Sequence, residues 1–175
     1  MLHECDSIKL LSIFFKEPSK EFHLRALARL MRWGPGRVER NLEEYIKASI
    51  ILKEQTSLIN KYKANTNSNM FKSLKLLYTL NVLLDALDEL DKKLLYPEAI
   101  VLFGSASKGE DLEKSDVDLC VIGSEKQIDV KSIEKQLNRK VNIIFLQPNE
   151  VAKAKKEFLN NLINGIVLKG YLKVL

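Results

Sequence analysis

The first third of the chain places its hydrophobic residues at helical spacing and then in two short runs. Apolar positions three or four residues apart predict three helices, over residues 4–16, 24–31 and 38–46. Gly34-Pro35-Gly36 precedes the third helix, and Pro35 suits a first helical position. Ser49–Lys53 and Leu58–Lys63 are strand-like runs separated by polar residues, which predicts a hairpin.

One long helix is predicted next. Residues 70–93 contain neither proline nor glycine, and their apolar residues cover more than one helical stripe. We therefore expect this helix to connect two domains and either to pack on both of them or to pair with a second chain in a homodimer.

After Pro97 the pattern changes to strands that alternate with helices. Strands are predicted over 98–103, 116–122 and 140–146, and helices over 127–137, 149–157 and 158–168. A helical crossover between the second and third strands makes those two strands parallel. The expected fold class is α+β, with one domain over residues 1–66, a connecting helix over 67–95 and an α/β domain with a small mixed sheet over 96–175.

Composition indicates an ordinary globular protein. The chain has 175 residues, and 46% of them are hydrophobic, enough for two small cores. Cys5 and Cys120 lie far apart within apolar runs, which excludes a disulfide framework and a zinc-ligand spacing. The sequence shows neither a leader-like segment nor an apolar run of membrane-spanning length. We expect a soluble, cytoplasmic protein without a membrane partner.

The net charge of +5 is concentrated near the N-terminus. Residues 1–70 carry 12 Lys and Arg against 8 Asp and Glu, whereas residues 71–175 carry 16 against 15. Five arginines fall within sixteen residues and are opposed only by Glu39; they are Arg25, Arg29, Arg32, Arg37 and Arg40. Such a cluster suits contact with phosphate groups.

Three helices followed by a hairpin resemble a winged helix-turn-helix domain. In such domains the third helix lies in the major groove of DNA and the hairpin touches the backbone. The resemblance implies binding of double-stranded DNA and transcription regulation, through Arg25, Arg32, Arg37, Arg40 and Asn41. The alternatives are that the arginines only solvate a helix pair, or that the domain binds another protein.

The C-terminal half carries a glycine-serine turn and a pair of carboxylates. Gly104 and Ser105 follow an apolar strand, and Asp116 and Asp118 stand one residue apart at the start of the next. Side chains alternate along a strand, so we expect both aspartates on one face, where Mg²⁺ and nucleotide phosphates could meet them. Gly104 permits close approach of a phosphate, Ser105 can donate its hydroxyl, and Lys108 adds a cation.

This combination resembles the nucleotidyltransferase superfamily typified by the DNA polymerase beta fold, and especially its minimal branch. Its parts are Gly104-Ser105, a glycine at position 109, and Ser-Asp-x-Asp-Leu beginning at Ser115. The resemblance implies a nucleoside triphosphate, such as ATP, held by Gly104, Ser105 and Gly109 with Lys108 beside them. It also implies that Asp116 and Asp118 are catalytic and bind Mg²⁺ while a nucleoside monophosphate passes to an acceptor.

The family places a third carboxylate on the next strand, where this chain has Asn142. An amide can accept a hydrogen bond or weakly ligate a cation, but it cannot take up a proton as a general base near neutral pH. Glu110 or Asp111 in the loop, or an acidic group on the substrate or a partner, are alternatives for that role.

The order of the two modules is similar to that in a family of prokaryotic regulator-like fusions of a winged helix and a minimal nucleotidyltransferase. Three functions stay open. The first is a DNA-associated, Mg²⁺-dependent nucleotidyltransferase. The second is a transcription regulator whose C-terminal domain senses nucleotide or dimerises without catalysis. The third is an antitoxin-like nucleotidyltransferase that modifies a partner toxin protein or RNA.

Overall fold

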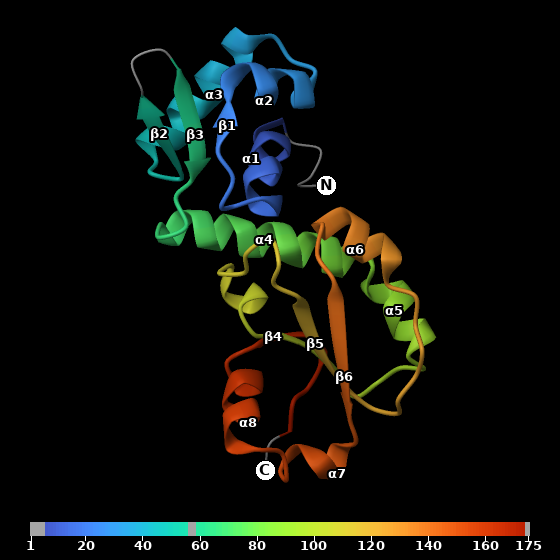
Figure 1. The fold of residues 1–175 in the computed structure, drawn as a ribbon. Helices are drawn as coiled ribbons and strands as arrows, with labels where there is room; N and C mark the ends of the chain where they lie inside the picture. The colour runs from blue at the N-terminus through green and yellow to red at the C-terminus, as the bar shows by residue number, and fades with distance from the viewer. Residues whose placement is uncertain (1–5, 56–58, 174–175) are drawn as a thin grey trace. The chain divides into compact units, whose positions relative to one another are not determined.

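The computed structural model describes residues 6–55 and 59–173, and the chain divides into two compact units. The first unit covers Met1–Tyr78 and the second Thr79–Leu175, with the division inside one helix (Figure 1). The three-part division at residues 66 and 95 stays a prediction. In the described residues no helix is long and apolar enough to cross a membrane.

The N-terminal unit contains three helices and a three-stranded antiparallel sheet. Its elements are α1 (Asp6–Lys16), β1 (Phe22–His23), α2 (Leu24–Met31), α3 (Pro35–Lys47), β2 (Ile51–Gln55), β3 (Asn60–Ala64) and the first part of α4 (Asn69–Asp85) (Figure 1). The strand order is β1-β3-β2. Pro35 stands in the first turn of α3, and Phe14 meets Phe22 edge-on with the ring centroids 5.2 Å apart.

The three predicted helices and the hairpin are present, with shifted strand limits. The prediction that the first strand begins at Ser49 is wrong, because Ser49 adopts a left-handed φ of 56° and ends the turn after α3. The strand starts at Ile51, which pairs with Ala64. The second strand is β3, which starts at Asn60; Leu58 and part of the expected turn lie outside the described residues. β1 was not predicted, since two residues show no alternation.

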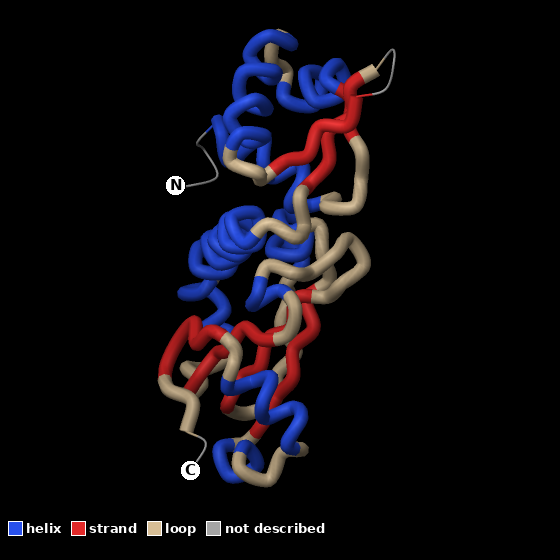
Figure 2. The backbone as a smooth tube through the Cα atoms, turned by 90° about the vertical axis from the view of Figure 1, so that its left-hand side faces the viewer, coloured by secondary structure: helices blue, strands red, loops and turns tan. Residues whose placement is uncertain are grey.

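The C-terminal unit is a four-stranded mixed sheet with helices. Its elements after α4 are α5 (Leu87–Lys93), β4 (Ala99–Phe103), the 3-10 helix η2 (Ala106–Lys108), β5 (Val117–Ile122), α6 (Lys131–Leu137), β6 (Val141–Leu146), α7 (Pro148–Val151), α8 (Lys156–Ile163) and β7 (Ile166–Gly170). The strand order is β6-β5-β4-β7. β4 is antiparallel to both of its neighbours, and β5 is parallel to β6, as the crossover predicted. Figure 2 shows these strands from the side.

Two predicted helices in this part of the chain are wrong in extent. The helix expected over 70–93 breaks at Ala86, whose N–H donates to Leu83 O at 3.2 Å, and so forms α4 and α5. The helix expected over 158–168 ends at Ile163. Gly165 then lies so close to β4 that a Cβ atom there would stand 2.6 Å from Leu102 O, and the chain continues as β7.

The other two predicted helices are shorter than expected. The helix expected over 127–137 begins at Lys131, where Asp129 Oδ1 accepts the backbone N–H of Lys131 at 3.0 Å. The helix expected over 149–157 covers only Pro148–Val151, and a reciprocal capping box between Gln147 and Glu150 starts it.

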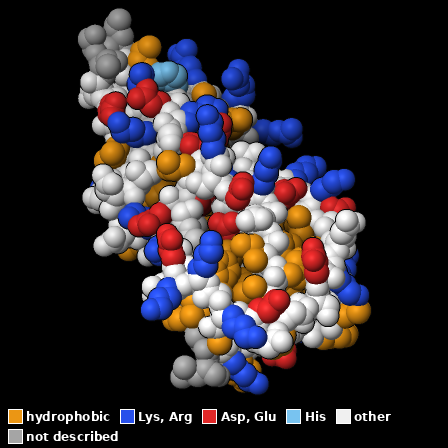
Figure 3. All heavy atoms as spheres, turned by 60° about the horizontal axis from the view of Figure 1, so that its bottom comes forward, with side chains coloured by type: hydrophobic (Ala, Val, Ile, Leu, Met, Phe, Trp, Pro, Cys, Tyr) orange, Lys and Arg blue, Asp and Glu red, His pale blue; other side chains and the backbone are white. Residues whose placement is uncertain are grey.

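The sheet has a buried strand pair at its centre. All five residues of β4 are buried, and one face of the sheet packs on α7 and α8 through Val101, Cys120 and Leu162. Figure 3 shows hydrophobic side chains among charged ones on the surface of this unit; Ile163, Val167 and Tyr171 are exposed hydrophobic residues of its last segments (Figure 3). Because both central strands are buried, their register is fixed. This also fixes the positions of the residues where β4 ends and where β5 and β6 begin.

Candidate functional site

Three strands bring one residue each to the same edge of the sheet. Phe103, at the end of β4, pairs with Asp118 on β5, and Asp118 pairs with Asn142 on β6. Asp118 is half-buried and Asn142 is exposed. The amide Nδ2 of Asn142 donates to Asp118 Oδ1 at 3.0 Å. The structure therefore places the expected third-position residue beside the second aspartate.

Gly104 follows immediately and contacts the same carboxylate. Its φ is +73°, a left-handed conformation that favours glycine. A Cβ atom at this position would stand 2.8 Å from Asp118 Oδ2. Both the backbone conformation and the close approach therefore require glycine here, and Asp118 lies directly against the turn.

The turn after Gly104 is a short 3-10 helix fixed by its own hydrogen bonds. Ser107 Oγ donates to Gly104 O at 2.7 Å, and Glu110 N–H donates to Ser105 O at 3.0 Å. Gly109 ends the turn with φ +67°. Lys108 is exposed, whereas Gly109 is buried. Sequence reasoning missed Ser107, whose hydroxyl holds the turn; its position two residues after the Gly-Ser pair was the available signal.

Asp116 lies just before the strand on which the sequence placed it. The prediction that the strand begins at Asp116 is wrong by one residue, because β5 begins at Val117; Asp116 is exposed in the preceding loop, and Val117 between the two aspartates is buried. The N–H of Val117 donates to Lys140 O at 2.8 Å, which brings the loop beside the start of β6. Asp116 thus remains next to the sheet edge that carries Asp118.

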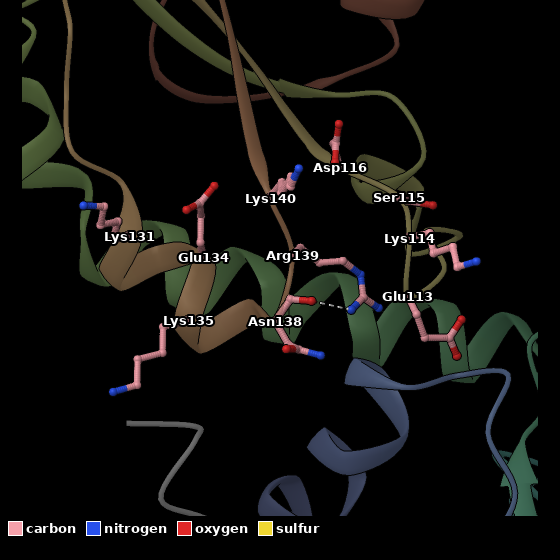
Figure 4. Close-up of a pocket in the computed structure, with 10 residues that line it drawn as sticks. All are labelled: Glu113, Lys114, Ser115, Asp116, Lys131, Glu134, Lys135, Asn138, Arg139 and Lys140. Atoms are coloured by element: carbon pink, nitrogen blue, oxygen red, sulfur yellow. Dashed lines mark hydrogen bonds between the residues drawn. The ribbon is translucent and has the colours of Figure 1, made fainter.

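A pocket of about 640 Å³ opens beside Asp116. Figure 4 shows its walls, which come from the loop before β5, from α6 and from the segment that leads into β6 (Figure 4). The basic residues that line it are Lys114, Lys131, Lys135, Arg139 and Lys140. Asp116 lines this pocket, whereas Asp118 and the Gly104–Gly109 turn do not. Asp116 therefore belongs to the wall of this lysine-rich pocket as well as to the predicted site.

The loop acid Asp111 is used structurally. Its carboxylate lies 3.4 Å from the Nε atom of Arg139, and the two side chains are 5% and 2% exposed. Arg139 also donates through Nη1 to Asn138 O at 2.9 Å (Figure 4). A carboxylate this enclosed and ion-paired stabilises the fold. Of the two loop acids named as alternatives for the third carboxylate, Glu110 is the exposed one.

The donor set at this edge fits Mg²⁺ bound together with a substrate. Within the described residues no group of three His, Cys, Asp or Glu side chains could hold a metal ion. Asp116 and Asp118 supply two carboxylates, and rotation of the Asn142 amide would present an oxygen in place of its nitrogen. Mg²⁺ is commonly held by one or two carboxylates, retained waters and substrate phosphates. The phosphates of a nucleotide would therefore have to complete the coordination.

The arginines predicted to bind DNA lie on the N-terminal unit. Arg25 belongs to α2, Arg32 is the exposed residue that ends α2 with φ 55°, and Arg40 is exposed on α3. Arg37 is already engaged, because its guanidinium forms an ion pair with Asp6 and lies 4.1 Å from the centroid of the Trp33 ring.

Asn41 is also engaged, because its Nδ2 donates to Arg37 O at 2.9 Å. Arg25, Arg32 and Arg40 are thus the most available members of the predicted set.

Cys120 is a packing residue, as the sequence indicated. It is fully buried in β5, and this burial raises the pKa of its thiol to about 11. The thiolate is therefore scarce near neutral pH, and the residue carries no chemistry.

The fold defines a small α+β domain, and one end of its sheet carries a left-handed glycine, Asp118 and Asn142. Residues 80–164, just under half of the chain, match the family model described as "Nucleotidyltransferase domain". The match begins inside α4 and contains Gly104, Asp116, Asp118 and Asn142. Among curated proteins, none matches the chain.

Proposed function

We propose that the protein is a DNA-binding, Mg²⁺-dependent nucleotidyltransferase that transfers a nucleoside monophosphate from a triphosphate to an acceptor. The observation that carries the proposal is the alignment of Gly104, Asp118 and Asn142 at one sheet edge of a nucleotidyltransferase domain. A left-handed glycine against a carboxylate leaves the turn free of side chain where a phosphate would approach.

The reaction is a displacement at phosphorus. An acceptor oxygen forms a bond to the α-phosphorus, the bond from that phosphorus to the oxygen bridging to the β-phosphorus breaks, and pyrophosphate leaves. The acceptor loses its proton to a base or to solvent, and Asn142 cannot take it up. The turn from Ser105 to Gly109 orients the triphosphate, and Lys108 adds positive charge beside it.

Asp116 and Asp118 are the residues that would hold Mg²⁺. When bound, the metal neutralises charge on the phosphates and on the leaving pyrophosphate. Asp118 is the better-positioned ligand, because the hydrogen bond from Asn142 and the packing against Gly104 already fix its carboxylate. Asp116, which is exposed in the loop, can adjust to the phosphates that arrive.

Transfer is tested with a labelled triphosphate, Mg²⁺ and a panel of hydroxyl-bearing acceptors. Asp118→Asn preserves size and removes the charge, and we expect it to lower transfer by at least about 100-fold, the range for loss of one preorganised charge contact. Glu125→Gln is the matched control, since Glu125 is an exposed carboxylate of the same unit outside this edge. Equal transfer by the two variants would exclude the proposed site.

DNA binding is proposed for the N-terminal unit as a winged helix-turn-helix. Its support is the order of three helices and an antiparallel hairpin, with Arg25, Arg32 and Arg40 exposed on α2 and α3 or at their ends. Binding to duplex DNA should weaken as salt rises, and Arg40→Ala should reduce the slope of log affinity against log salt by about one. Lys9→Ala, an exposed basic residue on α1, is the charge-matched control and should leave the slope unchanged.

A second candidate function is nucleotide sensing without transfer, and Asn142 favours it. The domain would then bind Mg²⁺ and triphosphate, leave the triphosphate intact and change DNA affinity. Asn142→Asp distinguishes the two functions. It restores the acid that the family has at this position. If the protein is a sensor, the variant should gain transfer activity; if it is an enzyme that uses another base, its transfer activity should change little.

A further inference from the structure

The pocket beside Asp116 carries positive charge that the fold does not use. Lys114, Lys131, Lys135 and Lys140 line it, and all four are exposed. In the part of the chain that the structure describes, none of their ammonium groups forms an ion pair or a hydrogen bond. The other cation of the wall, Arg139, is committed to Asp111.

The wall also carries three carboxylates, Glu113, Asp116 and Glu134, so with Arg139 paired to Asp111 the four lysines leave an excess of one positive charge. Glu134 Oε1 accepts the backbone N–H of Val141 at 3.0 Å and so tethers the end of α6 to the start of β6. Lys131 and Lys135 stand four residues apart on α6, an arrangement in which like charges repel. Figure 4 shows both on the α6 side, with Lys114 on the opposite side of Arg139 (Figure 4). An anion in the pocket would relieve this repulsion.

The place of the pocket relates it to the sheet edge. The backbone hydrogen bond from Val117 to Lys140 O sets Lys140 beside the residue that follows Asp116. Asp116 is the one predicted site residue on the wall, and the Gly104–Gly109 turn is not part of it. A ligand here would therefore reach Asp116 without taking the place of a triphosphate at the turn.

From these observations we propose that the pocket binds the acceptor, and that the acceptor is a phosphate-bearing small molecule of nucleotide size. The volume of about 640 Å³ lies in the range of sites for single small ligands. Ammonium groups on flexible stems suit a phosphate more than a neutral sugar or peptide. The assignment of the ligand as acceptor rests on the proposed function, whereas the binding of a phosphate compound at this place does not.

The test is a titration of the full ¹⁵N-labelled chain with adenosine 5′-monophosphate and, separately, inorganic phosphate, without Mg²⁺. We expect saturable shifts in the amide signals of Lys131, Lys135 and Lys140, with those of Gly104 and Ser105 unchanged. Lys131→Gln/Lys135→Gln should weaken binding roughly tenfold or more, since two charge-assisted contacts are lost. Lys153→Gln/Lys156→Gln removes the same charge from exposed positions elsewhere in the unit and should not weaken it.

Three results would overturn the proposal. Shifts confined to the Gly104–Gly109 turn would place the ligand there. Equal weakening by both double variants would show a general charge effect. Affinity that keeps rising with the length of an oligonucleotide, or capture of a phosphorylated peptide in preference to the nucleotide, would replace the small molecule by a macromolecule.

A parallel titration with Mg²⁺ and a nonhydrolysable triphosphate tests the proposed function separately, because its shifts are expected at Gly104, Ser105 and Asp118. Failure of this second titration would count against nucleotidyl transfer while leaving the anion pocket in place.

Discussion

Gly104→Ala is the sharpest perturbation of the candidate site. Alanine must adopt the φ of +73° found at this position, which costs about 1–2 kcal/mol. Its Cβ would also stand 2.8 Å from Asp118 Oδ2, closer than such atoms come in proteins, so the carboxylate must move. Movement of Asp118 loses the hydrogen bond from Asn142, worth about 1 kcal/mol. We expect the unfolding free energy of the C-terminal unit to fall by about 2–3 kcal/mol.

The assay is urea unfolding followed through amide signals of β4 and β5, together with titration of Mg²⁺ and a nonhydrolysable triphosphate. Amide signals are needed because the single tryptophan, Trp33, lies in the N-terminal unit. Both stability and triphosphate affinity should fall in Gly104→Ala, since the same carboxylate is displaced. In the double variant Gly104→Ala/Asp118→Ala no carboxylate is present to be displaced. Its loss of unfolding free energy should therefore be about 1 kcal/mol smaller than the sum of the losses of the two single variants.

Substitutions at two other glycines distinguish backbone strain from displacement of the Asp118 carboxylate. Gly170 also has φ +73° and lies against Glu98 O, but it pairs with Ala99 at the other end of β4, so Gly170→Ala should lose stability and keep triphosphate affinity. Gly36 has open space around it in the first turn of α3, and Gly36→Ala should be neutral or stabilising by up to about 1 kcal/mol. A Gly104→Ala protein as stable and as tightly bound as the original would refute the close contact.

Three further outcomes follow from other contacts. Asp6→Asn releases Arg37 from its ion pair and should tighten duplex binding by at most about fivefold, because both side chains are about half exposed; weaker binding would show that the ion pair positions the arginine. Cys120, with its pKa raised to about 11, should react with a thiol reagent only as fast as the unit unfolds, measured in a variant whose other cysteine is serine. Asp111→Ala leaves the Arg139 guanidinium enclosed without its carboxylate and should cost about 3–5 kcal/mol in urea unfolding; a loss under about 1 kcal/mol would contradict that account.

Local sequence signals predicted the candidate site because they depend on neighbours in the chain. Glycine at position 104 and the parallel crossover through α6 are both readable from spacing, and together they align Asp118 with Asn142. Asp116 was expected as the first residue of the strand, whereas β5 starts at Val117, the first apolar residue of its pattern. Asp116 also lines the pocket, which no local signal in the sequence shows.

Features that depend on packing were out of reach. The run Ile166-Val167-Leu168 is apolar enough for either a helix or a strand, and only its pairing with β4 decides between them. The break at Ala86 has no proline or glycine to announce it. The wall of the lysine-rich pocket comes from three separate segments, so the pocket is not visible in the sequence. The close spacing of Lys131, Lys135 and Lys140 was a partial signal of it.

An amide at position 142 changes what the sheet edge requires. A third carboxylate at position 142 would repel Asp118. Asn142 instead donates a hydrogen bond to Asp118. Under the proposed function, nucleotide phosphates would complete the coordination of Mg²⁺. Under the proposed function Asn142 cannot take the acceptor's proton, so another base or solvent would accept it. Asp116 is the site carboxylate that lines the lysine-rich pocket. Under the two proposals, an acceptor bound in that pocket would therefore lie beside a residue that also holds Mg²⁺.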